Sequence, residues 1–170
     1  MRKKLWAWGG GAAAAAVAGA VVALGLSGGG GDTTPAPRAR QYTSFAACLL
    51  TDAKGITGPQ AAPVWAGMQD ASLATHAKAG YLAVAGPETE ANAQAYANTL
   101  IQHRCDLVLA VGKAPASAVR KLAPSSPKSR FITVGSGSTL HNVSFIAATS
   151  KTRTAVARAM EAAVDASSKE

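Results

Sequence analysis

The stretch DLVLAVG (Asp106–Gly112) is a continuous apolar run that ends at a glycine. Each of four other apolar runs either ends at a turn residue or leads into a helix. The others are ACLLTD (47–52), GYLAVAG (80–86), RFITVG (130–135) and NVSFIAA (142–148). Strands buried on both faces have continuous apolar sequences, and parallel strands need helical connections. The sequence therefore predicts an α/β fold, a doubly wound parallel five-stranded sheet with helices on both faces.

The expected strand order is 2-1-3-4-5. With right-handed crossovers, the second strand is added on one side of the first strand, and the third to fifth strands are added on the other side. Open parallel sheets bind ligands outside the carboxyl ends of their strands, at this switch point. Asp52 could accept a hydrogen bond from a ligand or stabilise its loop, and Gly112 could admit a ligand or simply make the turn. The candidate ligand-binding residues are Asp52, Ala53, Lys54, Gly112, Lys113 and Ser136.

Helical patterns fill the segments between the strands. Trp65 lies on the first of them, where it either packs in the core or stacks on a ligand ring. Pro115 is expected to open the third helix, and Ser150 is expected to cap the last.

The loop GSGSTLHN (135–142) contributes Ser136 and offers backbone N–H groups to an anion. It lacks the G-K-[ST] of a phosphate-binding P-loop, and its serine spacing differs from that of a nucleophile elbow. We therefore assign no catalytic residue and no cofactor, and we do not expect an enzyme.

The first 27 residues are expected to be a signal peptide or an N-terminal membrane anchor. Three basic residues at positions 2–4 precede an uncharged stretch from Leu5 to Leu26. A linker rich in Gly, Pro and Thr follows over residues 28–41, and the lobe occupies residues 42–170. The lobe should lie at the extracytoplasmic face of the cell membrane, or be secreted if the signal is cleaved.

The net charge of +8 overstates the basicity of the lobe, because five of the basic residues precede it. The remaining charges are scattered, and few aromatic side chains accompany them, so nucleic-acid binding is not expected.

Cys48 and Cys105 are the only cysteines. Cys48 is expected in the first strand and Cys105 just before the third, which is its neighbour. The two could form a disulfide, if their offset along the strands allows it, or remain two small buried side chains. Neither has a partner at ligand spacing, so no metal site is expected.

An ordered set of motifs resembles the basic membrane protein family of ABC-transporter substrate-binding proteins. It comprises LLTDAKGI (49–56), VWAGMQDA (64–71), CDLVLAVG (105–112), SRFITVG (129–135) and NVSFIAATSKTRTAVA (142–157). The resemblance covers residues 45–168, the amino-terminal lobe of the two-lobed family fold. It implies a type 1 periplasmic-binding fold and a nucleoside-like ligand, with Asp52 as the ligand contact that remains.

Two functions follow as expectations. In the first, the lobe binds a small polar ligand weakly, or together with a transporter permease, a second lobe or a second copy. In the second, it is a protein-interaction module whose ligand site has decayed, as the altered segment Ile56–Ala62 suggests.

Overall fold

The computed structural model describes residues 41–135, 137 and 139–169. The expected segment 1–27 and the expected linker 28–41, apart from its last residue Gln41, therefore lie outside the described residues, and so does Ser136. In the described part, the strands are β1 (Ala46–Thr51), β2 (Lys78–Ala83), β3 (Leu107–Val111), β4 (Arg130–Gly135) and β5 (Val143–Ala147). The helices are α1 (Ala61–Thr75), α2 (Glu90–Gln102), α3 (Lys113–Leu122) and α4 (Thr152–Ser167), with short 3₁₀ turns at Gly55–Thr57 and Ala123–Ser125.

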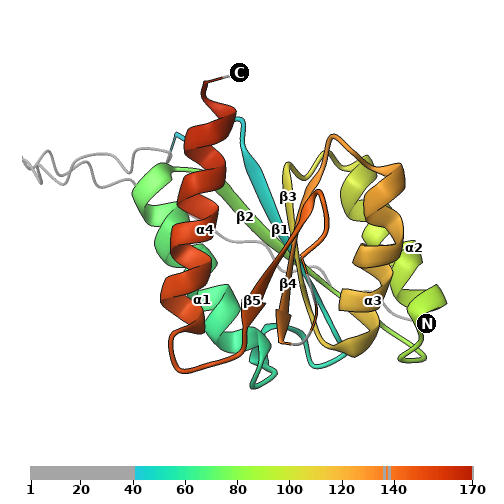
Figure 1. Cartoon of the computed structure of the whole chain (residues 1–170). Coiled ribbons are helices and arrows are strands. Elements are labelled where there is room, and N and C mark those ends of the chain that lie inside the picture. The colour runs from blue at the N-terminus through green and yellow to red at the C-terminus, as the bar shows by residue number, and fades with distance from the viewer. Residues whose placement is uncertain (1–40, 136, 138, 170) are drawn as a thin grey trace, which may run out of the picture. The chain divides into compact units, whose positions relative to one another are not determined.

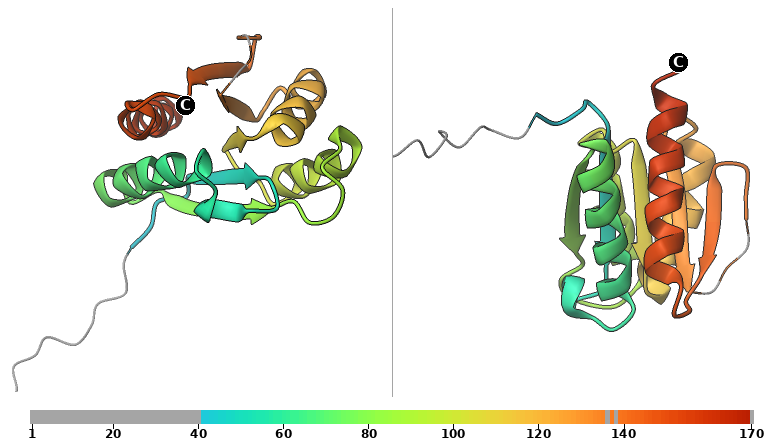
Figure 2. Two further views of the ribbon diagram at one scale, coloured as in Figure 1. Left: turned by 90° about the horizontal axis from the view of Figure 1, so that it is seen from below. Right: turned by 90° about the vertical axis from the view of Figure 1, so that its left-hand side faces the viewer.

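The five strands form one parallel sheet in the order β2-β1-β3-β4-β5, as predicted from the apolar runs. Helices α1 and α4 pack together on one face, and α2 and α3 pack together on the other (Figures 1 and 2). All five residues of the central strand β3 are buried, which explains why its sequence is apolar throughout.

Two apolar clusters, one on each face, hold the layers together. Leu49, Leu109 and Met160 are fully buried in the cluster under α1 and α4. Leu50 and Phe131 belong to the cluster under α2 and α3. Because successive residues of β1 point to opposite faces, this strand contributes to both clusters.

Helix α3 begins at Lys113, two residues before the expected Pro115, which is buried in the first turn. Proline is tolerated throughout the first turn, because the N–H groups there have no intrahelical acceptor. The sequence alone therefore placed the helix start too late.

The expected cap at Ser150 is wrong. Instead, the Thr152 hydroxyl donates to the carbonyl of Thr149 at 2.7 Å and accepts from its N–H at 2.8 Å. This reciprocal pair closes the turn before α4 and leaves Ser150 exposed.

Cys48 and Cys105 form a disulfide with a Cα–Cα distance of 5.9 Å. Cys48 is opposite Val108 in the sheet, so a straight extension of β3 would place Cys105 too far away. However, Arg104 is left-handed (φ 58°), and the Cys105 N–H donates to the carbonyl of Leu100 at 3.2 Å. Cys105 is therefore held in the turn that follows α2, close to β1.

Candidate functional site

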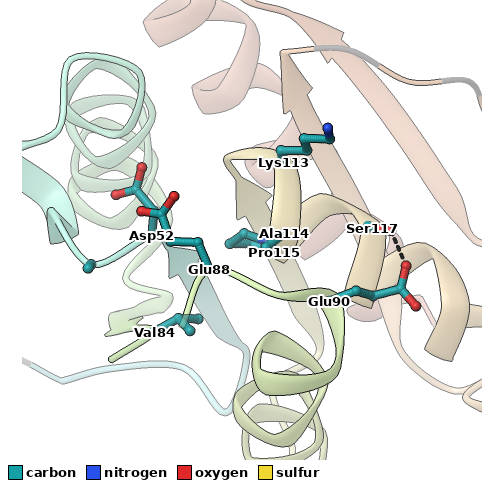
Figure 3. Close-up of a pocket in the computed structure, with 9 residues that line it drawn as sticks. Asp52, Val84, Glu88, Glu90, Lys113, Ala114, Pro115 and Ser117 are labelled. Atoms are coloured by element: carbon teal, nitrogen blue, oxygen red, sulfur yellow. Dashed lines mark hydrogen bonds between the residues drawn. The ribbon is translucent and has the colours of Figure 1, made fainter. Parts of the chain in front are cut away.

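The carboxyl ends of β1 and β3 meet at one edge of the sheet, and a cavity of about 270 Å³ lies there (Figure 3). We call it the acidic cavity because three carboxylates line it. Its lining residues are Asp52, Ala53, Val84, Glu88, Glu90, Lys113, Ala114, Pro115 and Ser117. The structure therefore brings together the predicted Asp52, Ala53 and Lys113.

Asp52 has a structural contact as well as a free oxygen. Its Oδ1 accepts from the N–H of Lys54 at 3.0 Å, which makes an Asx turn directly after β1. Its Oδ2 would lie 3.8 Å from a Cβ added to Gly112, so Asp52 packs against the start of α3. Gly112 has a φ of +99°, a conformation that other residues rarely adopt, so its glycine is required by the turn.

Lys54 is exposed and does not line the acidic cavity. Its backbone N–H holds the Asp52 carboxylate in place, so the contribution of Lys54 to this site is made by the main chain.

Lys113 lines the cavity, but its side chain extends away from Asp52 and Glu88 (Figure 3). Among the described residues it has neither a hydrogen-bond partner nor an ion-pair partner for its ammonium group.

Glu88 and Glu90 were missed by the sequence analysis. Both lie in the segment PETE (87–90), which follows β2, and β2 is the neighbour of β1 in the predicted order. The same edge-of-sheet argument that selected Asp52 would have selected them.

The two glutamates differ in their environment. Glu90 accepts a hydrogen bond from the Ser117 hydroxyl and pairs with the Lys121 ammonium at 3.1 Å. These two contacts, the Ser117 bond first, lower the pKa of the Glu90 carboxyl below its ordinary value. Glu88 is exposed and has no such partner in the described part of the chain. Asp52 and Glu88 are therefore the carboxylates available to a ligand.

A second cavity, of about 670 Å³, lies on the other side of the α3 start. We call it the basic cavity. Lys113, Ser117 and Arg120 line it from α3, and Gly135 and Gly137 line it from the end of β4. The predicted Gly112 also belongs to this cavity.

The described residues of the segment GSGSTLHN lie in different places. Gly137 lies at the basic cavity, whereas the Asn142 side-chain nitrogen lies 2.9–3.2 Å from the carbonyl oxygens of Ala123, Ser126 and Ser129. Asn142 therefore anchors the loop before β4.

Trp65 lies half-buried on α1, where its ring makes an edge contact with Tyr81 of β2 at 5.4 Å between centroids. It packs against the apolar cluster under α1 and α4, and it also lines a third cavity together with Tyr42 and Leu73. The half-buried packing expected of this tryptophan is therefore observed.

The described residues contain no group of three or more His, Cys, Asp or Glu side chains placed to hold a metal ion. Within the same residues, no helix is both long and apolar enough to span a bilayer.

No protein-family model matches the sequence, and no curated protein matches it. The fold is similar to that of a "putative lipoprotein" fragment from Peptoclostridium difficile 630, with a TM-score of 0.60 and 14% identity over 70% of this chain and 98% of that one.

Two weaker likenesses involve about a third of longer chains. One is a solute-binding protein of an ABC transporter system from Aeropyrum pernix K1, with a TM-score of 0.48 and 16% identity over 59% of this chain and 28% of that one. The other is a transcriptional activator of the comK gene from Bacillus halodurans, with a TM-score of 0.49 and 13% identity over 59% of this chain and 33% of that one. At these identities the comparisons show the fold alone.

Proposed function

We propose that this chain is an extracytoplasmic, membrane-associated lobe of the solute-binding type, and that it binds a small polar ligand in the acidic cavity. The observation that carries the proposal is the position of that cavity, at the carboxyl ends of β1 and β3, where open parallel sheets take their ligands. Its volume of about 270 Å³ is at the lower end for ligand sites, so the ligand is small.

The residues that line the cavity indicate which chemical groups the ligand carries. The carboxylates of Asp52 and Glu88 accept hydrogen bonds from hydroxyl or amino groups, and Val84, Ala114 and Pro115 offer apolar contact. A nucleoside-like molecule has both kinds of surface, as the resemblance to the basic membrane protein family implies.

Asp52 is partly exposed and Glu88 is exposed, so this lobe leaves one side of its ligand in water. We propose that a second protein surface covers it, either a transporter permease, a second lobe or another copy of this chain. Without that surface, affinity is weak, because tight sites bury most of the ligand.

The proposed location rests on the N-terminal charge pattern and on the disulfide, since disulfides persist in oxidising compartments. A reporter enzyme fused after Glu170 should be active outside the cytoplasm and inactive inside it. Activity in the cytoplasm would contradict this location, and the mass of the mature chain would show whether Trp6 is retained.

The proposal includes no catalytic step, so the ligand should be recovered unchanged. The test is a thermal-shift screen of the full chain against nucleosides, sugars and amino acids. A binding compound should raise the melting temperature, and Asp52→Asn should weaken its binding about tenfold, because a hydrogen bond to a charged acceptor becomes one to a neutral acceptor.

Asp165→Asn is the matched control for that test. Asp165 is exposed near the C-terminal end of α4. The carboxyl edge of the sheet lies at the other end of this helix, because α4 begins after the end of β5. The control should bind as the unmodified chain does. If Asp52→Asn and Glu88→Gln leave every affinity unchanged, the acidic cavity is not the binding site.

One observation favours the second function, a protein-interaction module. Tyr42, Leu73 and Tyr81 are each 51–58% exposed, and they surround the half-buried Trp65 beside the edge strand β2. The test is whether the full chain self-associates and whether the double variant Leu73→Ser, Tyr81→Ser abolishes that association. If it does, and if no compound binds, the interaction function replaces the ligand-binding function.

A further inference from the structure

Strand β2 is outermost in the sheet, and no strand of the described residues pairs with its outer side. The N–H groups of Lys78 and Val84 donate to carbonyls of β1 and of the residue before it, at 2.9 and 3.0 Å. Alternate residues of a strand direct their N–H and C=O groups to opposite sides, so the even-numbered residues face β1. The main-chain groups of Ala79, Tyr81 and Ala83 therefore point to the open side, which we call the β2 edge.

The sequence of β2 does little to protect this edge. The strand has no proline, and its one charged residue, Lys78, stands at its first position. Tyr81 is 51% exposed, and Figure 2 shows β2 at the margin of the sheet. Free N–H and C=O groups along such an edge are a template for a further strand.

The segment that precedes the described residues is poorly suited to supply that strand. Residues 28–40 include four consecutive glycines and the prolines Pro35 and Pro37. Glycine and proline are depleted in strands, and proline has no N–H to donate to a ladder.

A second copy of β2, by contrast, matches the edge in its main chain. In antiparallel pairing about a two-fold axis at Tyr81, Ala79 of each copy faces Ala83 of the other. All three outward-facing residues then form hydrogen-bonded pairs. Such an interface uses the same surface in both copies, which is the commonest arrangement of protein dimers.

The side chains on one face of the sheet agree with this register. Residues that lie opposite each other in an antiparallel pair have their side chains on the same face, so the two Tyr81 rings meet. Each ring already makes an edge contact with Trp65 of its own copy, at 5.4 Å between centroids. Aromatic pairs across strands stabilise a sheet, so the exposed Tyr81 gains a partner.

The charges at the two ends of β2 are complementary in the same register. Lys78 lies at the amino end, and in the antiparallel pair it stands opposite Val84 of the other copy. Val84 lines the acidic cavity together with Asp52 and Glu88. Each exposed Lys78 is therefore brought to the acidic end of the other copy, and the two-fold axis makes this contact twice.

We propose that two copies of this chain pair through the β2 edge, antiparallel and with Tyr81 on the two-fold axis. The inference rests on the interaction function named above, because it supplies the partner and the register for that function. It requires no ligand in the acidic cavity.

The first test is cross-linking of the full chain through one added cysteine. Opposite residues of a hydrogen-bonded pair lie about 5.5 Å apart between Cα atoms, within the range of a disulfide. Tyr81→Cys should therefore give a covalent dimer under mild oxidation. Ala79→Cys is the matched control on the same face of β2, because its two copies would lie about 14 Å apart. Equal cross-linking of the two variants, or none in Tyr81→Cys, would overturn the inference.

The second test is a charge exchange followed by sedimentation equilibrium of the full chain. Lys78→Glu and Glu88→Lys should each raise the dissociation constant of the dimer about tenfold, since like charges replace two complementary contacts. The double variant should restore it. Arg158→Glu, which makes the same change of charge at an exposed position of α4, should have no effect. A double variant as weak as the single ones would contradict the pairing of these two ends.

Amide hydrogen exchange identifies what covers the β2 edge. Protection of the Ala79, Tyr81 and Ala83 amides should increase with the concentration of the chain. Protection that is independent of concentration would assign the edge to residues 28–40 of the same chain and would overturn the inference. If the chain self-associates but Tyr81→Cys gives no cross-link, the interaction function stands and the pairing through β2 is wrong.

Discussion

Asp52 combines a structural contact with a candidate ligand contact, and the two can be separated by substitution. One oxygen closes the Asx turn on the Lys54 N–H. We expect Asp52→Ala to lower the free energy of unfolding by about 0.5–1.5 kcal/mol, since it removes this hydrogen bond. Asp52→Asn should lower it by less, because an amide oxygen still accepts from the N–H.

Urea unfolding of the three proteins measures this difference. The sequence allowed Asp52 either to contact a ligand or to stabilise its loop, and this turn assigns it the second role at least. Equal stability of the alanine variant and the unmodified chain would mean that the Asx turn is energetically unimportant.

At the scale of elements, Gly67 sets the distance between α1 and α4. A Cβ there would lie 2.3 Å from the carbonyl oxygen of Arg153, which is backbone and cannot move aside alone. We expect Gly67→Ala to destabilise the fold by about 1–3 kcal/mol, since the helices must separate. The higher helix propensity of alanine offsets only part of this loss.

Gly80 provides the matched control for that substitution. It lies in the edge strand β2, and a Cβ there would meet nothing within 4 Å. Gly80→Ala should therefore leave the unfolding midpoint unchanged or raise it slightly. If both alanine variants behave alike, close packing of α1 on α4 does not limit stability.

The same two helices are joined at their surface by an ion pair. Nε and Nη2 of Arg153 lie 2.6 and 2.7 Å from the two carboxylate oxygens of Asp70. The hydrogen bonds from Arg153 lower the pKa of the Asp70 carboxyl below its ordinary value of 3.8. The pair therefore stabilises the fold above the ordinary pKa, and this contribution is lost as the pH falls through the folded-state pKa.

Thermal unfolding of Arg153→Gln between pH 7 and pH 2 tests this linkage. The variant should melt below the unmodified chain at pH 7, and the two melting temperatures should converge in acid. Because the pair is partly exposed, added salt should also reduce the difference. Arg158→Gln, an exposed residue on the same helix, should show no such convergence, and a pH-independent difference for Arg153→Gln would rule out the ion pair as its cause.

At the scale of the whole molecule, the disulfide links β1 to the turn that follows α2 across 57 residues of sequence. A cross-link of this span restricts the unfolded chain, so we expect Cys48→Ala with Cys105→Ala to lower the free energy of unfolding by about 2–4 kcal/mol. Guanidinium unfolding measures the change.

Reduction of the unmodified chain should give the same loss of stability, and reductant should have no effect on the double alanine variant. An unmodified chain that is insensitive to reductant would show that the bond does not stabilise the fold. The two cysteines would then act as the pair of small buried side chains that the sequence also allowed.

The sequence by itself determined the sheet, its strand order and the edge at which a site would lie. Continuous apolar runs such as DLVLAVG have few alternatives to strands buried on both faces, and the crossover rule then restricts their order. Asp52, Ala53 and Lys113 could be placed at that edge because each directly follows a strand. Lys54 follows the same strand but does not line the cavity, since proximity in sequence does not set the direction of a side chain.

Only the tertiary structure decided how residues distant in sequence meet. The pairing of Cys48 with Cys105 depends on the left-handed backbone of Arg104. The hydrogen bond and the ion pair of Glu90 depend on Ser117 and Lys121 of another helix. The hydroxyl of Thr133, which is unpaired among the described residues, depends on what covers β4. Hydrophobic periodicity reports which face of an element is buried. It carries no information about which polar groups of packed elements come within hydrogen-bond distance, and that is why both cavities emerged only from the fold.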